Sequence, residues 1–493
     1  MTSMTSSRLA GRIGAVLALD PRADAIEFDG EWWTWGRLGE LARATAARVP
    51  APGSPCGILL RNTPQHVAAL LGVLLADGCV VTINPSLGTQ RVRSDLAELE
   101  LDLLVGTDSD LASYADGATR AVRLALRESA VAGAPAEQQV TTRPGTAVLM
   151  LTSGTTGPPK RIELGADVLV RTMEGAKHYE SGKALTPRLR TGVAIVNSPL
   201  VHLSGVFRVL QCVLDGRPFV LLPRFEVDAW VAAVRRHRPR TASLVPTALR
   251  MVLESDVGKD DLASLLSVTS GTAPLDPADA EAFEERFGVP VLTSYAATEF
   301  GGGVAGWNLA DHRAFGAAKR GSVGRAHPGC GLRVVDGSGA ALAADEVGLL
   351  EVKPAQLGPD APWMRTTDLA RLDPDGFLWI LGRADQTIIR GGFKVQPDTV
   401  RAALEQLPQV RAASVFGLPD ERLGELPVAL VELRDGVTAS PAELLDAVAP
   451  SLARYEVPAV LQAVERLPRT ASGKVDLPAA RALLDTHAKE GCR

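Results

Sequence analysis

The sequence predicts an α/β fold with a large N-terminal part and a smaller C-terminal unit. Through about the first 380 residues, segments with helical spacing of apolar residues alternate with short β-branched runs, which is typical of βα units with parallel sheets. The chain has 493 residues and so favours two or more domains. Near Gly382 a glycine-rich segment interrupts this rhythm and precedes a unit with its own helices and strands.

The chain is expected to begin with an amphipathic helix on the domain surface, at Ile13–Leu19. This apolar run follows Arg12 and could be mistaken for the core of a signal peptide. Polar residues and a proline follow at once, at positions 20–22, and no clear small-residue cleavage site is present. A surface helix is therefore the better interpretation.

The following segments predict alternating helices and strands. We expect a helix at Leu38–Val49, a strand at Gly57–Leu60, a helix at His66–Leu75 and a strand at Cys79–Ile83. The longest apolar run, Val67–Ile83, is interrupted by Asp77 and Gly78, so it predicts a buried helix followed by a strand, not a membrane span. The alanine-rich segment Asp116–Gln139 is expected to be a loosely packed surface passage.

The C-terminal unit has its own expected elements. They are a helix at Asp398–Leu407, strands near Val410–Phe416 and Pro427–Leu433, and a helix at Pro441–Val448. We place the domain boundary at Ala384 and Asp385, which divides the chain into residues 1–383 and 386–493 with a hinge at 384–385.

Composition excludes several classes of protein. Hydrophobic residues make up 46% and charged residues 22% of the chain, ordinary values for a globular enzyme. The formal net charge of -5 provides no basic field for nucleic acid, so we expect no such partner. The cysteines show no CxxC spacing, which favours neither a zinc site nor a disulfide framework and fits a reducing cytoplasm. The five cysteines are Cys56, Cys79, Cys212, Cys330 and Cys492.

The segment Leu151–Lys160, LTSGTTGPPK, combines a strand with a loop suited to phosphate. It follows the apolar run Ala147–Met150, and its glycines allow backbone amides to approach phosphate oxygens, while hydroxyls and Lys160 add donors and charge. It is not a Walker A loop, because Pro158 and Pro159 stand directly before the lysine. Taken alone, such a loop is as often a solvated turn.

Further segments downstream extend the pattern. They read SGTAPL at Ser270–Leu275, TSYAATE at Thr293–Glu299, WMRTTDLA at Trp363–Ala370, GRADQTIIRGGFKVQPDTV at Gly382–Val400 and LPRTASGKVD at Leu467–Asp476. Together with the loop, they resemble, in the same order, the motifs of the adenylate-forming superfamily, which contains acyl-CoA synthetases, peptide-synthetase adenylation domains and luciferases. The resemblance extends from about Ala25 to about Asp476.

This resemblance implies a fold and a reaction. The fold has a large adenylation domain with two doubly wound subdomains and a distorted β-barrel, followed by a small α+β domain that rotates about Asp385. The reaction uses ATP and Mg²⁺ to activate a carboxylic acid as acyl-AMP with release of pyrophosphate, and coenzyme A to accept the acyl group. Mg²⁺, lysine and amide or hydroxyl donors would offset the negative charge at the phosphates.

The resemblance also implies which residues bind the nucleotide. Tyr295 would stack on adenine, Thr298 would contact the α-phosphate, Glu299 would hold Mg²⁺ and Asp368 would bind the ribose hydroxyls. Hard oxygen ligands suit Mg²⁺ and an aromatic face suits a purine. The nucleotide-binding set is Thr152, Ser153, Gly154, Thr155, Thr156, Gly157, Lys160, Gly271, Thr272, Ala273, Tyr295, Ala296, Asp368, Ile380 and Arg383.

Some of these segments also allow a purely structural interpretation. SGTAPL could be a strand-to-helix turn in which Pro274 opens the next helix. Asp373–Gly376 is expected to be a tight turn between strands, so its acids are structural. Ala296 replaces the usual glycine of its motif. Gly391 and Gly392 would line a narrow passage for the pantetheine arm of CoA, or form only a hairpin turn.

The catalytic residues implied by the resemblance are Lys474, Thr298, Glu299 and His202. Lys474 would bridge the attacking carboxylate and the α-phosphate, which stabilises charge in the transition state. A lysine in a Ser/Gly loop is ordinarily only solvated, and its place in a complete ordered set favours the catalytic role.

The segment Asn197–Arg208, NSPLVHLSGVFR, resembles the one that lines the acyl pocket. It has no aspartate to pair with the ammonium of an α-amino acid, which disfavours amino acids as substrates. We expect an apolar pocket for a bulky, aryl, alicyclic or fatty acid. Its predicted lining is His202, Gly205, Val206, Val245, Thr272, Ala297, Gly301 and Gly302.

The acceptor is expected to be coenzyme A, because Phe416–Glu425, FGLPDERLGE, resembles a stretch common in CoA ligases. The alternative is the phosphopantetheine of an acyl carrier protein, and a homodimer stays open. A non-catalytic relative is disfavoured because Lys474, Glu299 and the Ser/Thr loop are retained. A light-emitting oxygenase has only fold analogy in its favour.

Overall fold

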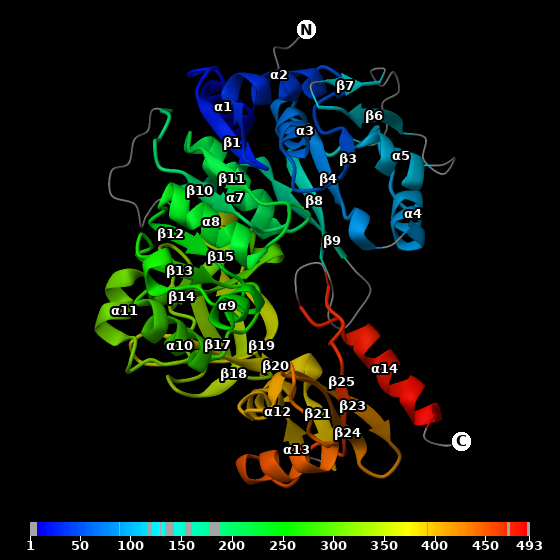
Figure 1. The fold of residues 1–493 in the computed structure, drawn as a ribbon, viewed down its shortest axis with the longest axis vertical. Coiled ribbons are helices and arrows are strands. Elements are labelled where there is room, and N and C mark those ends of the chain that lie inside the picture. Colours follow the sequence, from blue (N-terminus) through cyan, green and yellow to red (C-terminus); the bar gives the residue numbers. More distant parts are fainter. Residues whose placement is uncertain are drawn as a thin grey trace.

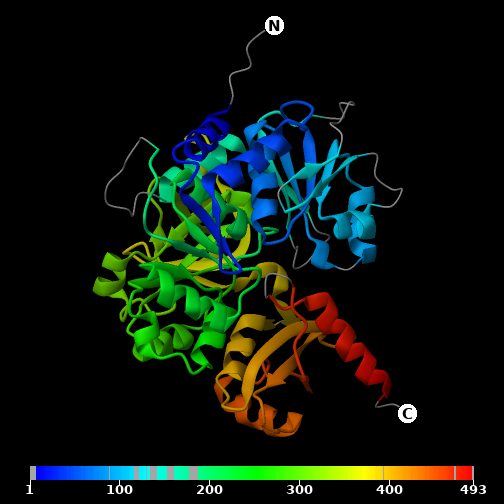
Figure 2. The same ribbon diagram turned by 45° about the horizontal axis from the view of Figure 1, so that its top comes forward.

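Five β-sheets with helices around them make up the described part of the chain (Figure 1). The computed structural model describes residues 7–87, 89–115, 121–128, 130–133, 142–152, 160–176, 187–391, 393–470 and 474–490, with side chains to residue 484. The first four sheets belong to a large N-terminal part and the fifth to a small C-terminal domain, as Figure 2 shows from a second direction. The predicted α/β class and this unequal division are confirmed.

The first sheet has seven strands in the order β7-β6-β5-β3-β4-β8-β9, parallel except for the edge strands β7 and β9. Helices cover it, so its inner strands are continuous apolar runs. Strands predicted at Gly57–Leu60 and Cys79–Ile83 are confirmed as β3 and β4. The expectation of a loose passage at Asp116–Gln139 is wrong for its described residues, because β6 and β7 lie there and extend the sheet. The strands are β3 (Pro55–Leu59), β4 (Cys79–Ile83), β5 (Leu103–Gly106), β6 (Val122–Leu126), β7 (Val131–Ala132), β8 (Thr146–Thr152) and β9 (Lys160–Gly165).

Helices of this region confirm the predicted pattern. The helix α3 is apolar on all sides and almost wholly buried, so the run from Val67 is a buried helix followed by β4. It crosses α2 closely at Gly72, where a Cβ atom would lie 2.4 Å from the carbonyl oxygen of Ala42. The predicted N-terminal helix is α1, which buries Ile13 and Val16. The helices are α1 (Arg8–Leu17), α2 (Trp35–Ala46), α3 (Pro64–Leu75), η1 (Pro85–Leu87), α4 (Thr89–Ala97), α5 (Asp108–Tyr114), α6 (Ala166–Ala176) and α7 (Leu203–Leu214).

No helix among the described residues is both long and apolar enough to span a membrane.

Two further sheets complete the α/β core of the large part. One has the order β10-β11-β1-β2, and the other has the order β12-β13-β14-β15-β16 with β12, β13 and β14 parallel. Trp230 and Phe283 are fully buried beside the second of these sheets. The strands are β1 (Asp24–Phe28), β2 (Glu31–Thr34), β10 (Ala194–Val196), β11 (Phe219–Leu221), β12 (Thr241–Ser243), β13 (Ser267–Ser270), β14 (Val291–Ala297), β15 (Gly302–Gly306) and β16 (Arg325–Ala326).

Short helices connect these strands. The helix after β13 starts at Pro277 with Asp276 as its N-cap, so Pro274 does not open it. The helices are α8 (Val227–His237), α9 (Pro246–Leu253), η3 (Lys259–Leu262), α10 (Pro277–Phe287), η4 (Thr298–Phe300) and α11 (Leu309–Phe315).

The fourth sheet is antiparallel and lies where the resemblance implies a barrel. Its described strands pair in the order β17-β18-β19-β20. The predicted turn at Asp373–Gly376 is confirmed between β19 and β20, where the Asp373 carboxylate accepts a hydrogen bond from the Phe377 amide. The elements are β17 (Gly331–Val335), β18 (Val347–Lys353), η5 (Ala355–Leu357), β19 (Met364–Leu372) and β20 (Leu378–Arg383).

The C-terminal domain packs helices on both faces of the fifth sheet, order β22-β21-β24-β23 with β25 beside β24. Its four predicted elements are confirmed as α12, β23, β24 and α13. The chain enters it from β20 through η6, which includes the predicted hinge residue Asp385; the hinge function stays a prediction. The elements are η6 (Ala384–Gln386), β21 (Ile388–Arg390), β22 (Phe393–Val395), α12 (Pro397–Glu405), β23 (Val410–Asp420), β24 (Gly424–Leu433), α13 (Pro441–Val448), η7 (Ala449–Ser451), β25 (Val460–Val464) and α14 (Leu477–Glu490).

Candidate active site

A cleft of about 2750 Å³ lies between the large part and the C-terminal domain. The parallel strands β12, β13 and β14 end at one edge of their sheet, so the segments that follow them come together there. Those segments line one side of the cleft, and α12, β23 and the stretch around Lys474 line the other.

Most of the predicted site residues lie on this cleft. They are Lys160, His202, Val245, Gly271, Thr272, Ala273, Tyr295, Ala296, Ala297, Thr298, Glu299, Gly302, Asp368, Ile380, Arg383 and Lys474. They come from positions more than 300 residues apart, and the fold brings them to one cavity.

Several other predicted residues do not line the cleft. Gly205 and Val206 face the core, because Val206 is fully buried and a Cβ on Gly205 would lie 2.2 Å from the carbonyl oxygen of Pro199. Their assignment to the acyl pocket is therefore corrected: they fix the start of α7. Gly301, Asp385 and Gly391, all of them described residues, are also absent from the lining.

The phosphate loop can be placed only by its two ends. Thr152 ends β8 and pairs with Lys160, the first residue of β9, so the loop closes an antiparallel hairpin. Lys160 thus opens a strand, although the sequence suggested that it ends the loop. Ser153, Gly154, Thr155, Thr156 and Gly157 lie outside the described residues, as does Gly392.

The segment after β13 has an unusual backbone. Thr272 has φ of 72°, in the left-handed region that a β-branched residue rarely adopts. At Gly271 a Cβ atom would lie 2.8 Å from Oγ of Ser294, so a larger residue would require this serine side chain to move. Strained backbone of this kind is found at ligand-binding sites, where the surrounding structure holds it. The lack of a side chain at Gly271 allows a planar ring to approach the backbone closely.

Tyr295 and Asp368 form a hydrogen bond across the cleft wall, with the phenol as donor. Burial raises the pKa of the Asp368 carboxyl, while this hydrogen bond and the nearby Arg383 act to lower it. Arg383 itself holds Asp385 through two hydrogen bonds, at 2.8 and 2.6 Å. A carboxylate and a guanidinium therefore stand side by side, at a register pair of β19 and β20.

Lys474 and His202 influence each other electrostatically although they belong to different domains. Burial lowers the pKa of His202 to about 4, and the charge of Lys474 contributes in the same direction. The Nε2 atom of His202 is buried, and no described residue forms a hydrogen bond with it. The Lys474 ammonium can be reached by water in the cleft, yet the enclosing walls lower its pKa; Arg383 also lowers it, and Glu299 and Asp368 raise it.

The predicted metal ligand of the site is the carboxylate of Glu299. Glu299 is exposed to the cleft. Among the described residues, no group of three His, Cys, Asp or Glu side chains could hold a metal ion. This arrangement fits Mg²⁺, which is usually bound by one or two carboxylates together with phosphate oxygens and water.

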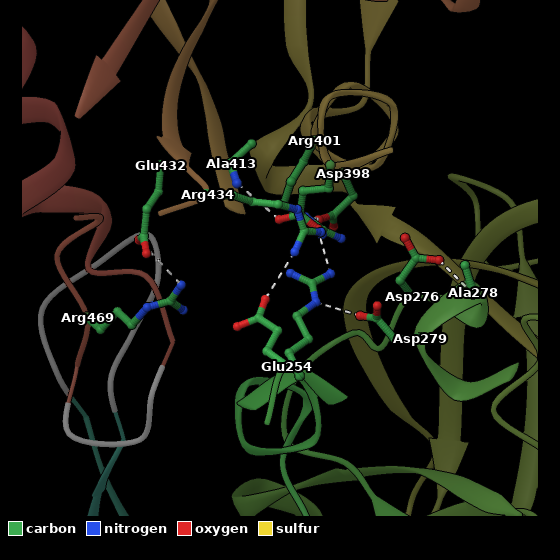
Figure 3. A network of polar contacts seen from close by, with 12 residues as sticks. Glu254, Asp276, Ala278, Asp279, Asp398, Arg401, Ala413, Glu432, Arg434 and Arg469 are labelled. Atoms are coloured by element: carbon green, nitrogen blue, oxygen red, sulfur yellow. Dashed lines mark hydrogen bonds and ion pairs between the residues drawn. The ribbon is translucent and has the colours of Figure 1, made fainter. Parts of the chain in front are cut away.

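Ion pairs join the two domains beside the cleft (Figure 3). Arg250 on α9 contacts Glu405 on α12 at 2.9 Å and Asp279 at 2.5 Å. Glu254 accepts hydrogen bonds from Arg411 at 3.0 Å and from Arg434 at 3.2 Å. These pairs connect the C-terminal domain to the large part in the orientation that places Lys474 at the cleft.

Sequence reasoning missed several residues that line the cleft. His327 packs on glycines of β15, since a Cβ on Gly306 would lie 2.7 Å from its Nε2 atom. Arg208 also lines the cleft; it is the last residue of the NSPLVHLSGVFR segment, and the resemblance implied no role for it. His327 had no sequence signal, whereas Arg208 was the one charged residue of a segment interpreted as apolar.

Comparison with known protein families matches nearly the whole chain. Residues 15–359 match the model of the AMP-binding enzyme family, and residues 400–474 match the AMP-binding enzyme C-terminal domain. A 2-succinylbenzoate–CoA ligase of Bacillus velezensis is 30% identical over 485 residues, which cover 93% of this chain and 94% of the relative. An indoleacetate–CoA ligase of Aromatoleum aromaticum is 29% identical, with coverage of 93% and 94%.

A solved structure also matches nearly the whole chain. The o-succinylbenzoate CoA synthetase from Bacillus subtilis, in complex with its acyl-adenylate intermediate, superposes with a TM-score of 0.78 at 26% identity. The match covers 94% of this chain and 96% of that structure's chain.

Proposed function

The chain belongs to the AMP-binding enzyme family, and on this premise we propose that it is an ATP-dependent carboxylic acid–CoA ligase. In the first step, a carboxylate oxygen of the acid forms a bond to the α-phosphorus of ATP, and the bond from that phosphorus to the leaving pyrophosphate breaks. In the second, the sulfur of CoA attacks the acyl carbon, AMP leaves and the thiol proton passes to water.

The position of Lys474 carries this proposal. It extends from the C-terminal domain into a cleft whose other wall holds His202, Glu299 and Asp368. Two negative groups, the acid and the α-phosphate, must approach each other in the first step, and a cation between them lowers the barrier. Glu299 and Asp368 support the charged form of the lysine, because both raise its pKa.

Each nucleotide group has a suitable counterpart on the wall. The ring of Tyr295 and the close backbone at Gly271 fit an adenine, and the Asp368 carboxylate fits the ribose hydroxyls as an acceptor. Thr298 would donate to the α-phosphate. A magnesium ion held by Glu299 would supply positive charge to the phosphates.

His202 would act as a neutral imidazole. Its pKa of about 4 keeps it uncharged at neutral pH, and its Nε2 atom, which has no partner in the described part of the chain, could form a hydrogen bond with a bound acid. An uncharged ring leaves Lys474 as the cation that faces the acid.

The second step would need a different orientation of the C-terminal domain. In the described orientation Lys474 is at the cleft, whereas Gly391, in the hairpin between β21 and β22, is away from it. Rotation about Asp385 would exchange them, and the Arg250–Glu405 contact would break. An acyl carrier protein is the alternative acceptor, since its pantetheine arm has the same chemistry as CoA.

The acid is expected to have an apolar body. Val245, Phe207 and Ala297 line the cleft, and no aspartate stands in Asn197–Arg208 to bind an α-ammonium group. A bulky, aryl, alicyclic or fatty acid therefore fits better than an amino acid.

The test is product analysis by mass spectrometry with ATP, Mg²⁺, CoA and a panel of acids, for the wild type and Lys474→Ala. We expect acyl-CoA and AMP in equal amounts from the wild type. The variant should lose acyl-AMP formation by more than about 100-fold, yet convert supplied acyl-AMP and CoA to thioester. Formation of acyl-AMP without thioester would indicate that the acceptor is a carrier protein and not CoA. Absence of acyl-AMP formation with every acid would overturn the proposal.

A further inference from the structure

One face of α7 is turned to the cleft and carries a cation. The residues on the core side, among them Val206, Val209 and Leu210, are fully buried. Ser204, Phe207 and Arg208, at helical spacing on the other side, line the cleft. The same helix begins directly after His202, so its N-terminal end meets the reacting part of the proposed site.

Arg208 has no acidic partner among the described residues, although it is half-buried on the cleft wall. Its guanidinium donates a hydrogen bond to the neutral amide of Gln211 at 3.1 Å, and no carboxylate among the described residues pairs with it. Elsewhere on the cleft Arg224 pairs with Glu226, Arg250 with Glu405 and Arg383 with Asp385. Arg208 is thus a cation held at the wall with donors left over.

The surroundings of Arg208 make its charge unfavourable in free energy when no ligand is bound. Burial lowers the pKa of the Arg208 guanidinium, and the charge of Arg217 acts in the same direction. A guanidinium nevertheless stays protonated in proteins, so Arg208 remains a partly desolvated cation that no described carboxylate neutralises. An anion bound in the cleft would compensate that charge, and the planar fork of donors matches a carboxylate or sulfonate.

We propose that Arg208 binds a second anionic group of the acid, so that the substrate is an acid with an additional carboxylate or sulfonate at the far end of its apolar body. This inference rests on the proposed ligase function and names the substrate class of the same site. The acid would lie along α7, with its reacting carboxylate near His202 and Lys474 and its second anion at Arg208.

The helix sets the length of such a molecule. Arg208 follows His202 by six residues, which corresponds to about 9 Å along the axis at the rise of an α-helix. Two anions joined by a short aliphatic chain or by one aromatic ring with an acidic arm span a distance of this order. Phe207 on the same face offers apolar contact to the part between them.

The experiment compares acids in pairs that differ only at the far end: carboxylate against carboxamide, on an aliphatic chain and on an aryl scaffold. The rate of acyl-AMP formation and the KM for each acid are measured for the wild type, Arg208→Gln and Arg208→Lys. Arg224→Gln is the matched control, since it also removes a cleft arginine, but one that Glu226 already neutralises.

We expect the wild type to prefer the dianionic member of a pair, and Arg208→Gln to lose about 10- to 100-fold of kcat/KM for it, mainly through KM. The carboxamide should be affected little, and Arg208→Lys should recover part of the loss. Arg224→Gln should leave the preference unchanged.

Equal use of both members of a pair by the wild type, or an equal loss for both in Arg208→Gln, would overturn the inference while the ligase function stands. Absence of acyl-AMP with every acid would instead remove the proposed function, and this inference with it.

Discussion

The hydroxyl of Tyr295 donates a hydrogen bond to the carboxylate of Asp368, 73 residues further along the chain. The pair joins β14 of one sheet to β19 of another, so it fixes the wall of the cleft where we propose that adenosine binds. Burial raises the pKa of Tyr295, with the charge of Asp368 as a further cause, so the phenol stays protonated and remains a donor.

Removing the Tyr295 hydroxyl should shift the pH dependence of ATP use. Asp368 has a pKa raised by burial and lowered by the Tyr295 hydrogen bond, so Tyr295→Phe raises it further. If only the ionised carboxylate accepts both ribose hydroxyls, the loss of kcat/KM for ATP on acidification begins at a higher pH in the variant. A pH profile of kcat/KM for ATP measures this. Tyr295→Phe keeps the aromatic ring, whereas Tyr295→Ala removes it and should lower kcat/KM for ATP by about 10-fold or more. If the acidic limbs of the pH profiles coincide for the wild type and Tyr295→Phe, the prediction is wrong.

His202 should titrate far below the ordinary range. Its folded pKa of about 4 compares with 6.5 for a free histidine, so the folded protein binds fewer protons between these values. The associated stability is present above about pH 6.5 and is lost as pH falls towards 4, on the order of 3 kcal/mol. Urea unfolding of wild type and His202→Gln at pH 7 and pH 5 measures this difference. A histidine NMR titration gives the pKa directly, and a midpoint near 6.5 would show the prediction to be wrong.

The contacts of Glu254 should favour one half-reaction. Glu254 pairs with Arg411 and Arg434 of the C-terminal domain in the orientation that places Lys474 at the cleft. Glu254→Gln should slow acyl-AMP formation by about threefold, in line with partly exposed ion pairs, and spare thioester formation from supplied acyl-AMP. The two half-reactions are assayed separately. Glu226→Gln removes a pair within the large part and is the control; equal slowing of both steps by Glu254→Gln would count against domain rotation.

Gly205 should matter for stability. A Cβ there would lie 2.2 Å from the carbonyl oxygen of Pro199, so Gly205→Ala forces backbone to move and should destabilise the fold by about 1–3 kcal/mol. Gly11→Ala, in a helix with nothing within 4 Å of the new atom, should instead stabilise it by about 0.5–1 kcal/mol. Thermal unfolding of the two variants distinguishes these signs. If Gly205→Ala kept full stability and lost only acid affinity, the original acyl-pocket assignment would regain support.

Local pattern was enough to predict many elements and much of the candidate site. The buried helix and strand in Val67–Ile83 follow from apolar runs broken by Asp77 and Gly78. The motif resemblance pointed to Tyr295, Asp368 and Lys474, and these three residues line one cleft. The prediction for Asp116–Gln139 was wrong because alanine-rich sequence shows no clear helical or strand periodicity. Only pairing with neighbouring strands shows that β6 and β7 form there.

Contacts between distant parts of the chain could not be predicted in this way. Arg250 and Glu405 are 155 residues apart, and no local signal selects one glutamate among many as the partner of one arginine. The burial of Gly205 and Val206 likewise depends on how α7 is rotated about its axis, which its neighbours decide.

The sequence by itself determined the α/β class, the family and the chemical groups available for adenylation, because hydrophobic periodicity and motif order are properties of neighbouring residues. Only the tertiary structure decided which side of α7 faces the cleft, that Lys474 and His202 line the same cleft, and that no described carboxylate pairs with Arg208. Charge compensation depends on distances through space, and the folded chain alone fixes those distances.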